Sequence, residues 1–392
     1  MHRFIFSQKD SWISELTASQ NHGGDEILEF RKDYNTSDSA SFTFGVTRVL
    51  TQFDLTDISK SMASDDISDA KFFLRLYSTE ASELPSTYNV SAFPVSESWE
   101  EGTGKNLDVP IIKDGVTWQY RNAQLFDGWV VGNNVSSGSR IYGSGSESNG
   151  SGSDDGGSWY TGSGFESSQL FSYSSPDIEM DVTNTVYKWI SGSAGTTYPS
   201  GIENNGFILL RSGSEENDNS RQNLKFFSRN TNTIYSPKLE VRWDDHTGID
   251  SSVPANYTSS LTSLDMTGGV DNYIYMRGLR SHYKETETVK FRVGARKRFI
   301  GKTFSTSVQN ITGSYVADTS GSYSIRDLAT DDIIIPFGEY SYLSMDGSSM
   351  YFKQDLNTFH PGRVYKVLIK VKYDDDQEII YDDDSFQFKV VR

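Results

Sequence analysis

The chain has 392 residues, of which 13% are aromatic, and a formal net charge of −17 at pH 7. This length is enough for two or three domains, each with a hydrophobic core of its own. An acidic chain without a basic stripe repels nucleic acid, so nucleic-acid binding is excluded as an expected role. The sequence contains no cysteine, which excludes disulfides, thiolate metal sites and a cysteine nucleophile.

The amino terminus and the hydropathy pattern predict a protein that is made in a cytoplasm. The opening MHRFIFSQKDSWISE lacks the apolar core of a signal peptide. No window approaches the ~20 apolar residues of a membrane-spanning helix, so we expect no membrane insertion. A large β-protein without disulfides is also typical of a bacterial or phage protein that folds in a reducing cytoplasm.

Composition predicts a domain boundary near residues 246–255. Residues 1–245 contain 19 Lys and Arg against 34 Asp and Glu, a net charge of −15, whereas the remainder contains 17 against 19, a net charge of −2. All seven Trp residues precede residue 244, and the following stretch is polar and rich in turn residues. We therefore expect a first domain over 1–246. A second turn-rich stretch over 310–322 predicts two smaller domains, over 250–312 and 313–392.

Short apolar segments predict an all-β fold for the first domain. They are rich in Val, Phe, Leu and Tyr and mostly alternate with polar residues, as half-buried strands do. One helix is expected over Asp181–Ile190, where Val182, Val186 and Trp189 fall on one face. Many short strands joined by turns indicate a β-sandwich. The expected strands cover 42–55, 70–78, 88–95, 206–212, 224–229 and 238–243.

Residues 135–168 interrupt this pattern, because 9 of these 34 residues are Gly and 12 are Ser. Such a segment buries too little apolar surface to offset its backbone entropy, so a flexible insertion between two strands is the simplest interpretation. The alternative is that its aromatic residues contact a neighbouring subunit or a glycan. These candidate interaction residues are Tyr142, Trp159 and Tyr160, together with Phe165.

Several ordered blocks carry a resemblance to a known domain type. Asn21, Gly23 and Gly24 precede ILEF, and RVLTQFDL, DAKFFLRLY, FPVSESWEEGTG, DGVTW and the DVTNTVYKWISG…SPKLEVRW finish follow in this order. Together they resemble DNRLRE-type jelly rolls, which are similar to the propeptide-like and carbohydrate-binding modules of bacterial surface proteins. The resemblance covers about residues 1–245 and implies an N-terminal jelly-roll β-sandwich with one short helix and a Gly/Ser-rich insertion.

Within these blocks, Trp99, Trp118 and Trp189 are expected to seal the edges of the sandwich core. Arg48 and Asp54 lie six residues apart and therefore on the same face of one expected strand. A structural salt bridge or a turn contact is the simplest role for these two residues.

The last 140 residues resemble the tail of structural proteins of large contractile-tailed, T4-like marine phages. The resemblance rests on MRGLRSHYKETETVKFRVGARKRF and on the segment from YSIRDLATDD to SFQFKVV. FHPGRVYKVLIKVKY itself reads as a turn that leads into an alternating strand. We expect two small Ig-like β-sandwiches here, with Tyr340, Tyr342 and Tyr351 as candidate docking residues.

No residue pattern predicts a catalytic or cofactor site. The five His residues form none of the metal-binding or nucleophilic groupings that carry known chemistry. The carboxylates are too numerous for a glycosidase pair to be singled out, and they are expected to form acidic surface. The acidic runs at 153–158, 373–376 and 381–384 could supply oxygen ligands to Ca²⁺, but they lack the spacing of a compact calcium loop, and solvated charge is the simpler interpretation.

Three functions from different classes remain open. The first is a non-enzymatic structural protein of a tailed-phage virion, placed in its collar, tail, fibre or capsid surface, with other virion proteins as partners and a homo-oligomeric state. The second is a glycan-binding module for attachment to the host surface. The third is a polysaccharide-degrading enzyme, which usually needs a larger or repetitive β-architecture. The two resemblances favour the first function.

Overall fold

The computed structural model has an all-β fold, which confirms the expected fold class. In its described part it contains many short strands, two α-helices and a few 3₁₀ turns. The described residues are 1–34, 44–82, 87–129, 139–142, 156–172, 177–194, 202–211, 221–248, 261–267, 271–299, 301, 304, 306–307, 313–374 and 376–392.

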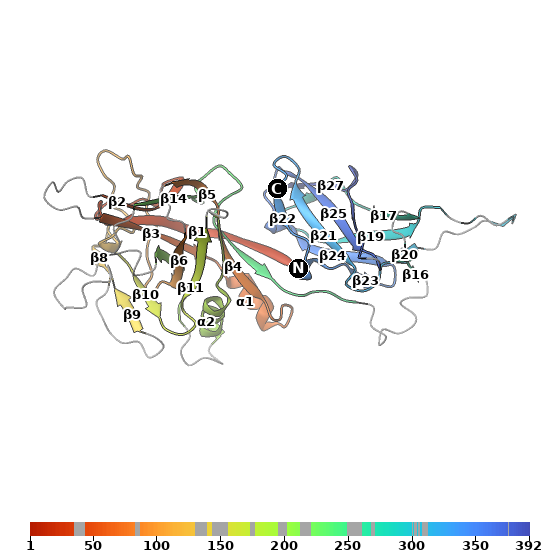
Figure 1. Cartoon of the computed structure of the whole chain (residues 1–392). Helices are drawn as coiled ribbons and strands as arrows, with labels where there is room; N and C mark the ends of the chain where they lie inside the picture. Colours follow the sequence, from red (N-terminus) through yellow and green to blue (C-terminus); the bar gives the residue numbers. More distant parts are fainter. Residues whose placement is uncertain are drawn as a thin grey trace. The chain divides into compact units, whose positions relative to one another are not determined.

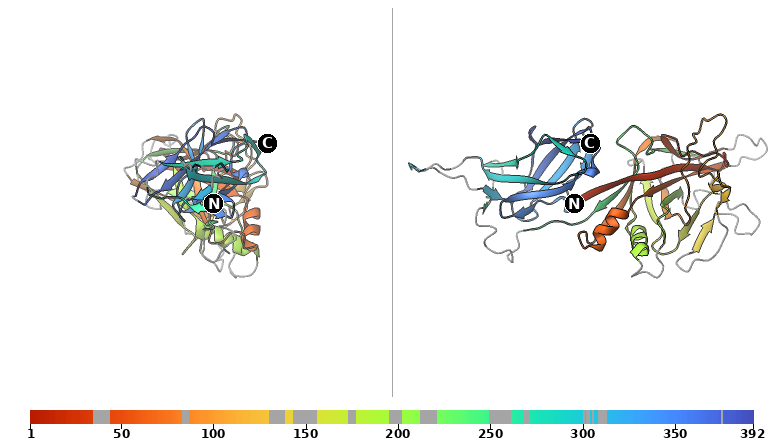
Figure 2. Two further views of the ribbon diagram at one scale, coloured as in Figure 1. Left: turned by 90° about the vertical axis from the view of Figure 1, so that its right-hand side faces the viewer. Right: turned by 180° about the vertical axis from the view of Figure 1, so that it is seen from behind.

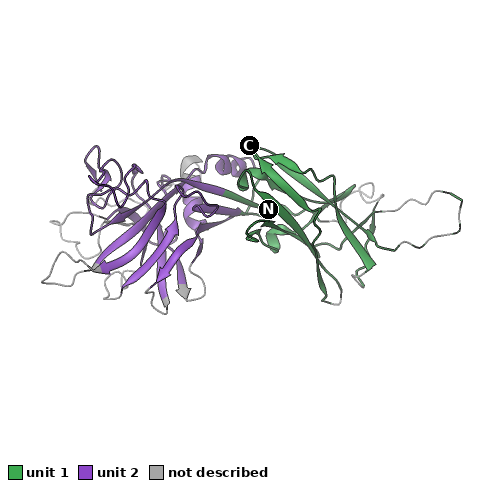
Figure 3. Ribbon diagram, turned by 90° about the horizontal axis from the view of Figure 1, so that it is seen from above, with its two compact units in different colours: residues 1–4, 67–70, 242–392 green, residues 5–66, 71–241 purple. Residues whose placement is uncertain are grey.

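The chain divides into two compact units, which Figure 3 colours separately. We call residues 5–66 and 71–241 the N-terminal unit, and residues 1–4, 67–70 and 242–392 the C-terminal unit. The division at residue 242 lies close to the change in composition. The first four residues and the short segment 67–70 belong to the C-terminal unit, although they precede most of the N-terminal unit in sequence.

The N-terminal unit is built around one long, branched sheet (Figure 1). Its main path runs β11 (Ser167–Ser172), β6 (Thr87–Pro94), β13 (Phe207–Arg211), β3 (Phe44–Phe53), β1 (His2–Ser14), β15 (Lys238–Arg242), β4 (Lys71–Leu76) and β12 (Ile178–Asp181). A branch from β3 continues through β2 (Ile27–Tyr34), β14 (Gln222–Phe227) and β5 (Ser78–Ser82). Each expected strand of this unit corresponds to one of these strands. Two short hairpins, β7 (Tyr120–Asn122) with β8 (Asp127–Gly128) and β9 (Ser139–Tyr142) with β10 (Ser158–Thr161), complete the described strands.

The described part of the N-terminal unit contains two short helices, each of which follows a strand. The expected helix is present as α2 (Thr183–Ala194), and Asp181 accepts a hydrogen bond from the Thr183 backbone N–H at 2.9 Å. A second helix, α1 (Thr56–Ala63), was not expected. Asp54 accepts hydrogen bonds from the backbone N–H and hydroxyl of Thr56 at its start. Asp54 therefore makes a turn contact, one of the two roles expected for it.

The three tryptophans expected in the core, Trp99, Trp118 and Trp189, are buried, which confirms that prediction. Arg48 is buried as well, and its guanidinium lies 4.8 Å from the Trp118 ring and 5.1 Å from the Trp159 ring. It also donates to the carbonyl of Gly156 at 2.7 Å. Arg48 thus connects β3 to the last part of the Gly/Ser-rich segment.

The sequence blocks that carry the jelly-roll resemblance meet at the side chain of Asn21. Its Nδ2 donates to the carbonyls of Glu101 at 2.7 Å and Val116 at 2.8 Å. Its Oδ1 accepts from the backbone N–H groups of Gly23 and Gly104. A Cβ atom at Gly23 would lie 2.0 Å from the carbonyl oxygen of Glu101, so only glycine permits this approach. These blocks therefore serve the fold.

The described residues of the C-terminal unit form two six-stranded sheets that lie as two layers (Figure 1, Figure 2). The first contains β16 (Leu261–Ser263), β17 (Asn272–Arg277), β19 (Thr288–Lys297), β20 (Gly313–Tyr315), β23 (Ser344–Asp346) and β24 (Ser349–Asp355). The second contains β18 (His282–Lys284), β21 (Gly321–Asp327), β22 (Ile333–Ile335), β25 (Val364–Lys372), β26 (Glu378–Tyr381) and β27 (Gln387–Val391).

Strands from both sides of residue 312 share these sheets. For example, β19 pairs with β24, and β18 pairs with β27. One cluster of buried residues, extending from Leu264 to Val390, fills the unit. The structure therefore shows one β-sandwich where two small Ig-like modules, over 250–312 and 313–392, were expected. The alternating strand expected in FHPGRVYKVLIKVKY is present as β25, which pairs antiparallel with β26.

Candidate ligand-binding face

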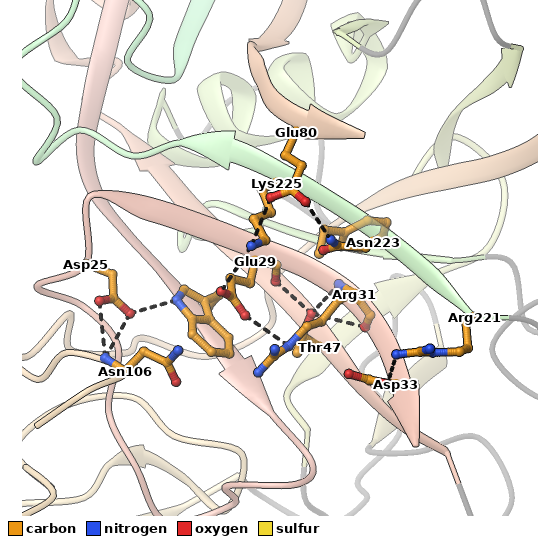
Figure 4. Close-up of polar contacts among 12 residues, drawn as sticks. Asp25, Glu29, Arg31, Asp33, Thr47, Glu80, Asn106, Arg221, Asn223 and Lys225 are labelled. Atoms are coloured by element: carbon orange, nitrogen blue, oxygen red, sulfur yellow. Dashed lines mark hydrogen bonds and ion pairs between the residues drawn. The ribbon is translucent and has the colours of Figure 1, made fainter. Parts of the chain in front are cut away.

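The outward side of β2, β14 and β5 carries a dense array of polar side chains (Figure 4). Along β14, Asn223 and Lys225 are partly exposed, whereas Leu224 and Phe226 are buried. This alternation is that of a half-buried strand, and β2 repeats it. We call this surface, formed by Glu29, Arg31, Asp33, Glu80, Arg221, Asn223, Lys225 and Phe227, the β14 face.

Opposite charges alternate across the strands of the β14 face. Lys225 stands opposite Glu29 on β2 and Glu80 on β5, with its Nζ 4.0 Å and 3.1 Å from their carboxylates. Arg31 pairs with Glu29 at 2.9 Å. Exposed ion pairs of this kind add little stability, so their main effect is to hold the side chains in defined positions.

The backbone beneath the face is held by Thr47 of β3. Its hydroxyl accepts from the Arg31 N–H at 2.7 Å and donates to the Glu29 carbonyl at 2.6 Å. At one end of the face, Arg221 donates to Asp33 at 2.8 Å. The polar side chains therefore stand on a backbone that is itself fixed to the core of the sheet.

A small pocket of about 90 Å³ opens at this end of the face. Its lining offers guanidinium, ammonium and amide donors together with carboxylate and amide acceptors. Such a set can bind the hydroxyl groups of a polar ligand or an anionic group. The pocket is lined by Arg31, Lys32, Asp33, Arg221, Gln222, Asn223 and Lys225.

Aromatic rings gather at the other end of β14. The rings of Phe227 and Tyr235 are stacked at 5.5 Å, and Tyr77 lies 5.4 Å from Tyr235. The ammonium of Lys238 is 4.8 Å from the Tyr77 ring. Six residues of strand separate Arg221 from Phe227, a distance of roughly 20 Å. The face thus combines a polar pocket and an aromatic cluster along one strand.

Beside the β14 face, the buried side chain of Trp12 contacts His22 and Asp25. Its ring stacks on His22 at 3.7 Å, and its indole N–H donates to Asp25 at 3.0 Å. Asp25 also accepts from the backbone N–H of Asn106. Burial raises the pKa of Asp25, against the effect of these hydrogen bonds, and it lowers the pKa of His22 to about 3. His22 is therefore a neutral, stacked core residue.

The structure places Trp159 and Tyr160 in the interior, which corrects their expected role as contacts to a subunit or a glycan. Trp159 belongs to a buried cluster with Trp118, and Tyr160 stacks on Phe165 at 5.7 Å. The physical reason is that each large aromatic ring removes a large apolar area from water when it is buried. The side chain of Tyr142 lies outside the described residues.

Of the three tyrosines expected to dock, Tyr351 is only 7% exposed and lies beneath the ammonium of Lys290, 3.6 Å from its ring. Its ring is therefore not free to form the expected contact. Tyr340 and Tyr342 are partly exposed, and each meets a histidine ring edge-on, His2 at 6.2 Å and His246 at 5.8 Å.

The described acidic residues make local contacts. Lys366 pairs with Asp382 at 2.5 Å, Lys372 pairs with Asp376 at 3.2 Å, and Asp383 accepts from the Ser385 N–H. Within the described ranges there is no group of three His, Cys, Asp or Glu residues suited to hold a metal ion. Residues 153–155 of the run at 153–158, which include both of its acidic residues, lie outside these ranges. No helix among the described residues is long and apolar enough to cross a membrane.

No protein-family model matches the sequence, and no curated protein matches it.

Proposed function

We propose that the chain is a non-enzymatic structural component of a tailed-phage virion and acts through contacts with other virion proteins. The two sequence resemblances support this role, and the all-β fold is compatible with it. Virion proteins of this kind work by presenting surfaces, so the proposal depends on finding a surface shaped for a partner.

The observation that carries the proposal is an ordered loop with exposed apolar residues. Leu107 is 89% exposed and Val109 is 96% exposed. Contiguous exposed apolar side chains mark interaction sites on soluble proteins. The backbone of this loop is fixed to the rest of the N-terminal unit by hydrogen bonds, so the side chains of Leu107 and Val109 are already positioned for contact with a partner.

Gln20 fixes the start of this loop by donating to the carbonyls of Lys105 at 2.9 Å and Asn106 at 3.0 Å. The Asn21 backbone N–H donates to the carbonyl of Ile112 at its end. A loop that is fixed before binding loses less conformational entropy when it docks. This arrangement suits an apolar pocket on a partner protein.

The test is incorporation into particles. A chain with Leu107→Asp and Val109→Asp should fold normally, because both side chains are exposed, but it should be depleted from purified particles measured by mass spectrometry. Leu170→Asp, at an exposed leucine on β11, is the matched control and should be incorporated normally. Incorporation of the double variant at the wild-type level would contradict the proposed contact.

Glycan binding at the β14 face is the second candidate function. The pocket with its mixed donors and acceptors at one end of β14 and the stacked rings of Phe227 and Tyr235 at the other end favour it, because sugars are bound by directed hydrogen bonds and aromatic contact. A glycan array should then show binding by the wild-type chain that Arg221→Ala with Asn223→Ala abolishes. Lys71→Ala, at an exposed residue of β4, should leave binding unchanged. Binding unaffected by the double variant would exclude this face.

A further inference from the structure

Basic and aromatic side chains gather where β19 ends in the C-terminal unit. Lys297 and Arg298 are exposed, and Phe299 directly after them is 76% exposed. Phe304 further along is fully exposed. A large ring in solvent beside two cations is an unusual surface on a chain whose net charge is −17.

The base of this surface is ordered by the pairing of β17 with β19. Tyr273 and Tyr275 stack at 5.6 Å on β17, and the Arg296 guanidinium lies 4.8 Å from the Tyr273 ring. A Cβ atom at Gly294 would lie 2.5 Å from the Tyr275 ring, so the glycine makes room for it. We call Tyr273, Arg296, Lys297, Arg298 and Phe299 the basic–aromatic end.

The charges at this end contrast with those of the N-terminal unit. Next to the three consecutive cations lie Asp265, which pairs with Lys297 at 3.4 Å, and Asp271, whose carbonyl accepts from the Arg298 N–H. Residues 5–66 and 71–241 contain 31 Asp and Glu against 17 Lys and Arg, a net charge of −14. Each copy of the chain thus carries both a basic surface and a strongly acidic unit.

We propose that the basic–aromatic end docks on the acidic N-terminal unit of a second copy of the chain. Charge complementarity selects this partner, and the exposed rings supply the apolar contact area that interfaces need. The two surfaces differ, so the contact is heterologous and joins copies head to tail into a ring or an open filament. This inference does not depend on the virion role.

Sedimentation velocity of the full-length chain over roughly 1 to 100 µM tests the proposal. The wild-type chain should associate as its concentration rises. Lys297→Glu with Arg298→Glu should weaken association by about tenfold or more, and Phe299→Ala should weaken it as well. Lys284→Glu with Lys353→Glu changes the net charge equally at two other exposed lysines of the same unit, and it should leave association unchanged.

Three outcomes would overturn the proposal. The first is a wild-type chain that stays monomeric over the whole range. The second is equal weakening by the control pair, which would indicate a general effect of net charge. The third is a monomeric chain that binds a DNA oligonucleotide or anionic phosphatidylserine vesicles through Lys297 and Arg298, which would assign this end to another partner. Circular dichroism of each variant separates these outcomes from misfolding.

Discussion

The side chain of Glu101 accepts a hydrogen bond from the backbone N–H of Asp10 at 3.0 Å, so the partly buried Glu101 carboxylate lies beside the buried residue Asp10. Asp10 is 1% exposed, and its Oδ2 accepts from the Arg229 N–H at 2.7 Å. Its Oδ1 has no hydrogen-bond partner among the described residues. Burial raises the pKa of Asp10 to about 7, and it also raises the pKa of Glu101.

This geometry predicts that Asp10→Asn raises stability at neutral and higher pH. The folded state favours the protonated acid, whose ordinary pKa is 3.8. The stability that the protonated Asp10 contributes to the folded state is therefore fully present below pH ~4. It is lost as the pH rises through about 7, because the unfolded state loses this proton at a lower pH than the folded state. Asparagine keeps the acceptor for Arg229 but cannot ionise.

Urea unfolding between pH 4 and pH 9 measures this effect. The wild-type free energy of unfolding should fall by a few kcal/mol across this range through Asp10, and Asp10→Asn should remove that part of the slope. Asp57→Asn, at an exposed residue, is the control and should leave the slope unchanged. An unaltered slope in Asp10→Asn would show that Asp10 does not titrate in this range.

A second prediction concerns Asn21, whose side chain makes four hydrogen bonds among three loops. Asn21→Ala leaves the buried N–H groups of Gly23 and Gly104 without this acceptor. Because each buried unsatisfied group costs about 1–3 kcal/mol, we expect a loss of roughly 2–5 kcal/mol in the free energy of unfolding. Asn223→Ala on the exposed face should cost under about 1 kcal/mol. Equal effects in the two variants would contradict the role of Asn21.

Local sequence patterns predicted six strands of the N-terminal unit, because alternation such as QNLKFF reports directly which residues are buried, but they did not predict β1. They did not predict which strands are neighbours. The pairing of His282 with Lys389 joins residues more than a hundred positions apart, and no local signal contains it. For this reason a turn-rich stretch over 310–322 was interpreted as a boundary, although it joins strands of one sandwich.

The candidate site was missed for the same reason. The outward residues of β2 and β14 alternate visibly in the sequence, but only pairing across the sheet brings Glu29 opposite Lys225. Residues 135–138 and 143–155 of the expected Gly/Ser-rich insertion lie outside the described residues, but composition did not predict that its last part, 156–168, contacts the core. Gly and Ser predominate there, yet Trp159 and its contact with Arg48 are enough to fix the end of the segment to the core.

That contact leads to a third prediction. Arg48→Lys should destabilise the N-terminal unit by about 1–3 kcal/mol. The guanidinium of arginine is planar and stacks on Trp118 and Trp159, whereas the ammonium of lysine has no planar group that could replace it. The loss should appear in chemical unfolding and as a shift in tryptophan emission. Arg121→Lys, at a partly exposed arginine, is the control and should change neither. A stable Arg48→Lys variant with unchanged emission would contradict the stacking role.

The last prediction concerns Asp346 in the C-terminal unit. Its carboxylate lies 2.6 Å from the Lys290 ammonium and 3.0 Å from the Arg292 guanidinium, and it accepts from Ser348 as well. Although partial burial opposes it, this set holds the pKa of Asp346 well below its usual range. The group therefore stabilises the fold above its unfolded pKa, near 3.8, and this contribution is lost as the pH falls below that value.

Asp346→Asn should accordingly lower the free energy of unfolding at pH 7 by about 1–2 kcal/mol, a value discounted for partial exposure. The difference in the free energy of unfolding between variant and wild type should narrow toward pH 2. At that pH the unfolded wild-type chain binds a proton at Asp346 that the folded chain does not, and this stabilises the unfolded state. Raising the salt concentration should also narrow this difference, since screening weakens exposed ion pairs. Asp331→Asn, at an exposed residue paired with Arg326, is the control with little expected effect. A gap that stays constant from pH 7 to pH 2 would show that the loss is due to packing and not to the charge of Asp346.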